Sequence, residues 1–217
     1  MAESKKAALT QFHRQHILEA SERLFSEKGF NKTTMDDIAK AAQYSKATLY
    51  VYFKSKDEII NHLTLESMKM LYQHLHQALI TQTDFFECYK AICYELVTYQ
   101  ETSPLYFEIA LSDINIDIHN PQTPPIFKEI YDVGEQIDLE IAKLIKSGIE
   151  AGYVKEEIAI LPTIFWFWGS LTGIIRVASQ KQLYIFKSMS LSKNDFLDYS
   201  FKMLLQSILK DGVENAY

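Results

Sequence analysis

The sequence predicts an all-α protein, and three observations support this fold class. Only seven Gly and five Pro interrupt 217 residues. The strict alternation of apolar and polar residues that is typical of strands is rare. Several segments also begin with residues that cap helices. A hydrophobic content of 47% is enough for a sizeable core.

The first predicted helix covers about residues 10–28. Ile17 and Phe25 are inward positions of this helix. Gly29 follows as the residue that ends it, and Phe30 is placed for the apolar contact of a Schellman-type stop.

Two short helices joined by a tight turn follow. Thr34 is a good N-cap, and Asp37, three residues later, completes a capping box. Gln43 and Tyr44 occupy the turn, and Ser45 caps the second helix.

The second short helix divides into an apolar and a polar face. Leu49 and Phe53, four residues apart, face the core. The other face carries Lys46, Ala47, Thr48, Tyr50 and Tyr52. A helix that enters the major groove of DNA needs this division, so the pattern predicts a helix-turn-helix.

Residues 10–60 resemble the N-terminal domain of TetR-type (tetracycline-repressor family) transcriptional regulators. The resemblance covers about a quarter of the chain. The matching residues are Ala20, Leu24, Phe25, Gly29, Phe30, Thr33, Thr34, Asp37, Ile38, Ala39, Ala42, Ser45, Lys46, Thr48, Leu49, Tyr50, Tyr52, Phe53, Lys54, Ser55 and Lys56.

The chain departs from the family pattern at four positions. Gln43 and Tyr44 stand where the family usually has Gly and a small apolar residue, Ala47 replaces a Gly, and Val51 replaces a His. We therefore expect a turn that tolerates a non-Gly residue at position 43, with a strained positive φ as one solution. The other changes put the base preference in question rather than the mode of binding.

The charge distribution agrees with a nucleic-acid partner. Residues 1–56 contain ten Lys/Arg and six Asp/Glu, a net charge of +4, whereas residues 57–217 contain twelve and twenty-two, a net charge of −10. The alternative is a three-helix unit that never meets DNA. A basic segment on an acidic body favours a module that binds a polyanion.

Roles follow from position within the motif. Lys46, Ala47, Thr48 and Tyr50 are expected to reach base edges. Phosphate contacts are expected from Thr34, Ser45, Tyr52, Lys54 and Lys56. The resemblance implies that Thr34, Tyr50, Tyr52 and Lys56 bind the sugar–phosphate backbone of DNA. Lys5, Lys6 and Arg14 are expected to add non-specific contacts.

The remaining elements are predicted in chain order. A long helix over residues 55–81 opens with a Ser55–Glu58 capping box and links the DNA-binding unit to the body. Helices over about 84–101, after Pro104, and from Pro125 to about residue 151 follow. Residues 112–123 are predicted to form a loop, although isoleucines alternate there at 114, 116 and 118.

Residues 158–175 contain no charged side chain, and two interpretations compete. A membrane span needs about 20 apolar residues, but Pro162 and several Gly, Ser and Thr residues dilute this segment. We interpret it as a soluble helix that is buried all round. Gly169 and Gly173, one turn apart, form a flat strip that suits a helix–helix interface.

The last predicted helix covers about residues 192–210 and is apolar on more than one face. The resemblance implies that the last two long helices pair with their symmetry mates as a four-helix bundle. The expected interface residues are Gly169, Gly173, Phe196, Phe201, Leu204 and Ile208. A twofold dimer would place its recognition helices one turn apart on a palindromic operator.

The resemblance also implies a small-molecule pocket in the C-terminal domain. The candidate ligand contacts are Tyr94, Tyr106, Phe107, Phe165, Trp168 and Thr172. Glu108, His119 or Arg176 would supply polar specificity. This mixture predicts a largely apolar or aromatic effector, while aromatic residues at helical spacing also suit an ordinary core.

Other classes of protein find little support. No phosphate-binding loop, nucleophile elbow, zinc-protease motif or dinucleotide turn occurs, so we predict no catalytic residues, cofactor or metal. Cys88 and Cys93 do not face each other on a helix, so a disulfide is not expected. A polar N-terminus and two unpaired cysteines favour a cytoplasmic protein without a secretory signal.

The sequence therefore predicts residues 1–54 as a DNA-binding domain and residues 55–217 as a ligand-binding and dimerisation domain. The predicted function is a dimeric repressor, released from its operator by a small effector. The alternative is a TetR-like DNA binder that is controlled by a protein partner or acts architecturally, without a small-molecule effector.

Overall fold

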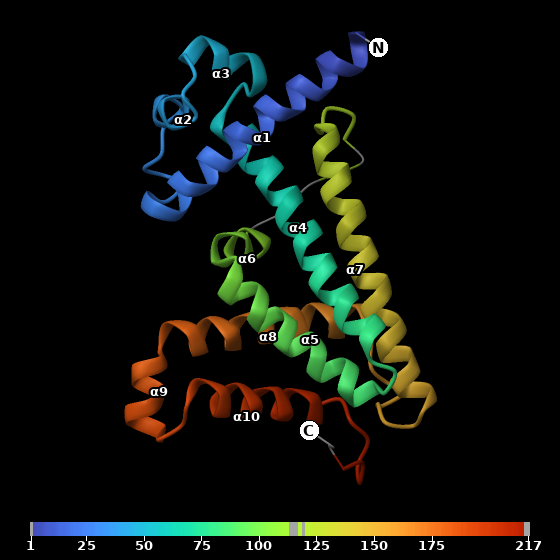
Figure 1. Cartoon of the computed structure of the whole chain (residues 1–217). Helices are drawn as coiled ribbons and strands as arrows, with labels where there is room; N and C mark the ends of the chain where they lie inside the picture. The colour runs from blue at the N-terminus through green and yellow to red at the C-terminus, as the bar shows by residue number, and fades with distance from the viewer. Residues whose placement is uncertain (1, 113–116, 119, 215–217) are drawn as a thin grey trace. The chain divides into compact units, whose positions relative to one another are not determined.

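The computed structural model describes residues 2–112, 117–118 and 120–214. These residues form helices without a regular sheet, which confirms the all-α fold class (Figure 1). The helices are α1 Ala2–Lys28, α2 Met35–Ala41, α3 Lys46–Tyr52, α4 Lys56–Thr81, α5 Phe85–Thr102, α6 Pro104–Ala110, α7 Pro125–Glu150, α8 Ile160–Gln180, α9 Gln182–Met189 and α10 Lys193–Gln206. His119 and the isoleucines at 114 and 116 lie outside the described residues.

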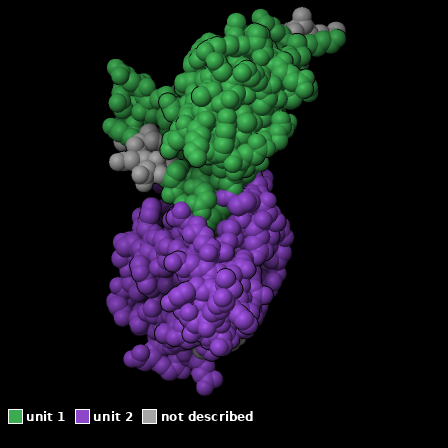
Figure 2. Space-filling view, turned by 90° about the vertical axis from the view of Figure 1, so that its left-hand side faces the viewer, with its two compact units in different colours: residues 1–68, 105–130 green, residues 69–104, 131–217 purple. Residues whose placement is uncertain are grey.

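The chain forms two compact units, coloured separately in Figure 2. The first unit contains residues 1–68 and 105–130, and the second contains residues 69–104 and 131–217. Helices α4 and α7 each contribute residues to both units. The domain boundary that we predicted after residue 54 remains a prediction.

The core of the first unit joins α1, α2, α3 and the start of α4. Ile17, Ile38, Leu49 and Phe53 are fully buried in it. Leu49 and Phe53 are the pair that the sequence placed on the inward face of the second short helix. Their burial fixes which face of α3 remains at the surface.

In the second unit, α8 and α10 run side by side (Figure 1). Ile175 of α8 and Phe201 of α10 are buried in the core of this unit. The prediction that the apolar helix is buried all round was wrong for the single chain. The side chain of Phe165, for example, is 65% exposed.

The boundaries of two predicted helices needed correction, and one helix was missed. Helix α1 begins at Ala2, because the Ala- and Lys-rich residues before position 10 are good helix formers. Helix α9 was not predicted, since neither Gly nor Pro separates it from α8. Helix α10 ends at Gln206, because the following chain pairs instead with residues 153–155, where Lys155 N donates to the Ile208 carbonyl at 3.0 Å.

Candidate nucleic-acid interface

The start of α2 is held by reciprocal hydrogen bonds, as the sequence predicted. Thr34 Oγ1 accepts from Asp37 N at 3.2 Å, and Asp37 Oδ2 accepts from Thr34 N at 2.9 Å. Lys28 Nζ lies 2.8 Å from the same carboxylate. Hydrogen bonds from Lys28 and Thr34 keep the pKa of Asp37 well below its usual range. The capping box therefore satisfies two main-chain N–H groups at the start of α2.

The turn between α2 and α3 contains a non-Gly residue with positive φ. Gln43 has φ 58°, so the strained solution for this turn is confirmed. Gln43 N donates to the Lys40 carbonyl at 3.1 Å, and Tyr44 N donates to the Ala39 carbonyl at 2.8 Å. These two bonds form a Schellman motif, which normally has Gly at the position of Gln43.

Tyr44 faces inward rather than toward a DNA partner. Its hydroxyl forms a hydrogen bond of 2.6 Å with His13 Nδ1, and its ring lies near those of His16 and Tyr52. It is partly buried against the core of the first unit. The large residue at this position therefore fills space between α1 and α3.

The recognition helix α3 presents a short polar surface. Ser45 Oγ accepts from Thr48 N at 3.0 Å and also hydrogen-bonds to the Thr48 hydroxyl. The side chains of Lys46, Ala47 and Tyr50 are exposed, whereas Thr48 is half-buried. Three of the four residues expected at base edges are therefore exposed, and the fourth, Thr48, is less accessible.

The three lysines predicted to contact DNA all have partners within the chain. Lys46 Nζ lies 2.7 Å from Asp36 Oδ1, and Lys54 Nζ donates to the Tyr50 carbonyl at 2.9 Å. Lys56 Nζ donates to the carbonyls of Phe30 at 2.7 Å and Thr33 at 2.9 Å. Sequence reasoning missed Asp36, because a carboxylate ten positions before Lys46 gives no local signal of its proximity.

The basic residues expected at the N-terminal arm differ in their environments. Lys5 and Lys6 are exposed. Arg14 instead points into the first unit, where its guanidinium lies 4.1 Å over the Phe53 ring. The expectation that Arg14 adds a non-specific DNA contact is therefore not supported by its position.

Comparisons with known proteins agree with this geometry. Residues 17–63 match the tetR family of bacterial regulatory proteins. The chain is 28% identical over 196 residues to IcaR, the negative transcriptional regulator of the biofilm operon icaADBC in Staphylococcus aureus (strain Newman), covering 87% of this chain and 95% of IcaR. It is 27% identical over 139 residues to the HTH-type transcriptional regulator YhgD of Bacillus subtilis (strain 168), covering 64% of this chain and 70% of YhgD.

The chain is a TetR-type transcriptional regulator. A solved structure of the TetR family regulator PfmR from Thermus thermophilus has the same fold, with a TM-score of 0.64. The two sequences are 23% identical, and the match covers 88% of this chain and 97% of PfmR. The relatives named here are regulators rather than enzymes, in agreement with the sequence prediction.

The candidate ligand contacts of this TetR-type chain belong to both units. Tyr106 and Phe107 lie in the first unit, where the Tyr106 hydroxyl donates to Glu22 Oε2 at 3.0 Å and Phe107 is fully buried. In the second unit, Thr172 is buried and its hydroxyl donates to the Trp168 carbonyl at 2.7 Å. Of the other three candidates, Phe165 is exposed, and Tyr94 and Trp168 are half-buried.

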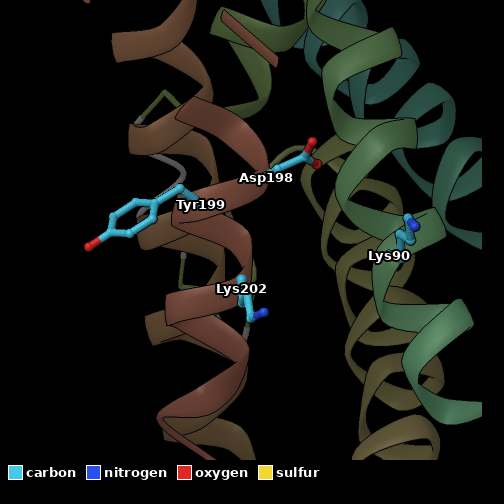
Figure 3. A pocket seen from close by; sticks show the side chains of 4 residues that line it. All are labelled: Lys90, Asp198, Tyr199 and Lys202. Atoms are coloured by element: carbon cyan, nitrogen blue, oxygen red, sulfur yellow. The ribbon is translucent and has the colours of Figure 1, made fainter. Parts of the chain in front are cut away.

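A shallow depression of about 240 Å³ lies between α5 and α10 in the second unit. Its lining residues are Lys90, Asp198, Tyr199 and Lys202 (Figure 3). None of the six candidates lines it, although the Tyr94 hydroxyl donates a short hydrogen bond to Asp198. The Tyr199 ring points away from α5 (Figure 3), and the other three lining side chains are charged.

The expected interface residues also occupy different environments. A Cβ added at Gly169 or Gly173 would meet no atom within 4 Å, so both glycines border open space. Phe201, Leu204 and Ile208 are buried within the second unit itself, and Phe196 is half-buried. The exposed large apolar side chains of α8, α9 and α10 are instead Leu161, Phe165, Trp166, Val177, Leu183, Tyr184, Phe186, Met189, Tyr199 and Met203.

Proposed function

We propose that this regulator is a sequence-specific, homodimeric repressor that binds a palindromic operator through α3. The observation that carries the proposal is the exposed face of α3, with Lys46, Ala47 and Tyr50 at the surface and Leu49 and Phe53 buried behind them. A helix anchored in this way can enter the major groove without disturbing its own domain. The name of its relative IcaR, a negative regulator, supports repression rather than activation.

The proposed contacts combine base reading with phosphate binding. Lys46, Ala47, Thr48 and Tyr50 would reach base edges, and the proposed phosphate contacts are Thr34, Ser45, Tyr52, Lys54 and Lys56. Lys56 already donates to two carbonyls. A lysine ammonium has three N–H donors, and this one also lies 4.1 Å from the Phe30 ring centroid, so a phosphate oxygen would compete with the ring for the third.

The test of DNA binding is fluorescence anisotropy on the duplex directly upstream of the protein's own gene. A scrambled duplex of equal length is the control, and both are titrated at two salt concentrations because phosphate contacts make affinity salt-dependent. We expect binding to the upstream duplex to survive competitor DNA. Equal binding to both duplexes, with a steep salt dependence for each, would contradict sequence-specific regulation from this site.

The exposed apolar side chains of α8 and α10 support a dimer. Helix α8 is long and apolar enough to cross a membrane, but a second copy of the chain accounts for its exposed face without one. The open strip at Gly169 and Gly173 lets a partner helix approach closely. Because Phe201, Leu204 and Ile208 are buried in the subunit core, we now propose Tyr199 and Met203 as the contacts from α10.

A charge placed on this face should separate the dimer. Met203 is 56% exposed, so Met203→Glu should fold normally but bury an unpaired carboxylate at the interface. Gln136→Glu on the exposed surface of α7 is the matched control with the same change in charge. Light scattering should report the monomer mass for Met203→Glu and the dimer mass for the control. A dimer that persists in Met203→Glu would place the interface elsewhere.

We also propose that a small, largely apolar or aromatic effector releases the repressor in the cytoplasm. Helix α4 supports this, because one continuous helix begins beside the recognition helix and extends into the second unit. An effector can shift the equilibrium only if it has different affinities for the DNA-binding and released states. A panel of aromatic acids and medium-chain fatty acids should contain compounds that raise the melting temperature and weaken operator binding. The absence of any response would favour control by a protein partner.

A further inference from the structure

The side chain of Arg14 joins three helices of the first unit. Arg14 lies on α1, and its Nη1 donates to the carbonyl of Tyr52, the last residue of α3, at 2.5 Å. Its Nη2 lies 2.6 Å from His62 Nε2 and 3.5 Å from Glu58 Oε1, both on α4. The side chain is 29% exposed. Arg14 therefore connects the end of the recognition helix to the beginning of α4.

The chemistry of this contact determines the protonation state of His62. An arginine guanidinium donates hydrogen bonds and accepts none, and it stays charged at every accessible pH. His62 Nε2 must therefore be the acceptor, so the proton of the neutral ring is on Nδ1. The Phe53 ring packs edge-on against the His62 ring, with centroids 5.5 Å apart. A doubly protonated His62 would present an N–H to Arg14 and lose this bond.

We propose that Arg14 and His62 are positioning residues that hold α3 in register with α4, and that they do so only while His62 is neutral. The inference rests on the proposed function, since it names the contact through which a change in α4 would reach the DNA-reading helix. Arg14 does not itself contact DNA in this proposal. It acts by stabilising the end of α3, where the last carbonyls of a helix lack partners within the helix.

The surroundings of His62 favour its neutral form. Burial and the Arg14 charge lower the pKa of His62 below its usual 6.5, in that order of importance. Glu58 and Glu66 on α4 and Glu129 on α7 act in the opposite direction. Because the pKa is lowered in the folded unit, the contact is complete above pH 6.5 and is lost as pH falls through the folded-state pKa.

The first test compares operator affinity across pH. His62→Gln retains a neutral acceptor but cannot take up a proton. Wild-type protein should lose affinity relative to this variant by about tenfold as pH falls from about 7.5 through the folded-state pKa of His62, which lies below its usual 6.5. The comparison at each pH cancels changes in the DNA and in other side chains. His74→Gln is the matched control, because His74 pairs with Glu95 in the second unit, and it should follow the wild type. A pH dependence that is unchanged in His62→Gln would overturn the inference.

The second test does not depend on DNA. The imidazole resonance of His62, identified by its disappearance in His62→Gln, is titrated by NMR in the wild type and in Arg14→Lys. We expect the pKa of His62 to rise in Arg14→Lys, because a lysine lacks the fork that reaches both partners. An unchanged titration would show that Arg14 does not control His62. A failure of the proposed function would give a different result: the wild type would bind the operator and the scrambled duplex equally at about pH 7.5.

Discussion

Replacing Gln43 with glycine should stabilise the DNA-binding unit. Gln43 has φ 58°, a left-handed conformation that L residues adopt at a cost. Its side chain is exposed, and the two hydrogen bonds of the Schellman motif come from main-chain N–H groups. Gln43→Gly therefore relieves the strain without removing a contact that holds the turn.

The size of the effect is a balance of two terms. A non-Gly residue in the left-handed region costs about 1–2 kcal/mol. Glycine gains more freedom than other residues in the unfolded chain, which opposes stabilisation by about 0.5–1 kcal/mol. The net gain is about 0–1.5 kcal/mol in the free energy of unfolding, with a midpoint of about 0.7 kcal/mol. For a chain of this size the midpoint corresponds to a rise in Tm of about 1–3 °C.

Thermal unfolding followed by circular dichroism measures this change. Gln43→Ala is the matched control, because it shortens the side chain but keeps a Cβ in the left-handed conformation. We expect Gln43→Gly to melt above the wild type and Gln43→Ala to melt close to it. A Gln43→Gly variant that melts at or below the wild type would refute the claim that this turn is strained.

Two further substitutions test packing and electrostatics. Gly148→Ala would place its Cβ 2.6 Å from the buried Phe85 ring. It should therefore destabilise the second unit by about 1–3 kcal/mol, measured by chemical denaturation. Gly169→Ala is the control and should not destabilise it, because its Cβ would meet no atom within 4 Å. Asp37→Asn removes the carboxylate whose pKa Lys28 holds below the usual 3.8. The stability from this carboxylate is present above pH 3.8 and lost as pH falls through the folded-state pKa, so the difference in Tm between Asp37→Asn and the wild type should shrink on acidification. A difference that stays constant with pH would contradict this account.

Several local features could be predicted because neighbouring residues decide them. The Thr34–Asp37 capping box, the positive φ of Gln43 and the stop at Gly29 each depend on side chains within a few positions of one another. Gly29 has φ 80°, and Phe30 contacts Phe25 as expected. The stop nevertheless differs in detail, because Gly29 N donates to the Phe25 carbonyl in the simpler left-handed motif rather than a Schellman pair.

The C-terminal part was harder to predict for a physical reason. Phe201, Leu204 and Ile208 could face a partner subunit or the chain's own core, because both environments select the same apolar residues. Only the packing of α10 against α8 places Phe201 inside the subunit and leaves Met203 outside. The same ambiguity made α8 seem suited to complete burial, whereas one of its faces is exposed.

The sequence by itself determined the helical class, the helix-turn-helix and the face of α3 that is buried, since short-range spacing and capping govern all three. Only the tertiary structure decided which charged side chains meet across the fold. Lys46 pairs with Asp36 and Arg14 reaches His62, contacts that span 10 and 48 positions. Helix packing decides such pairs, because a charged side chain pairs with the group of opposite charge or the acceptor that the packing places within hydrogen-bond distance.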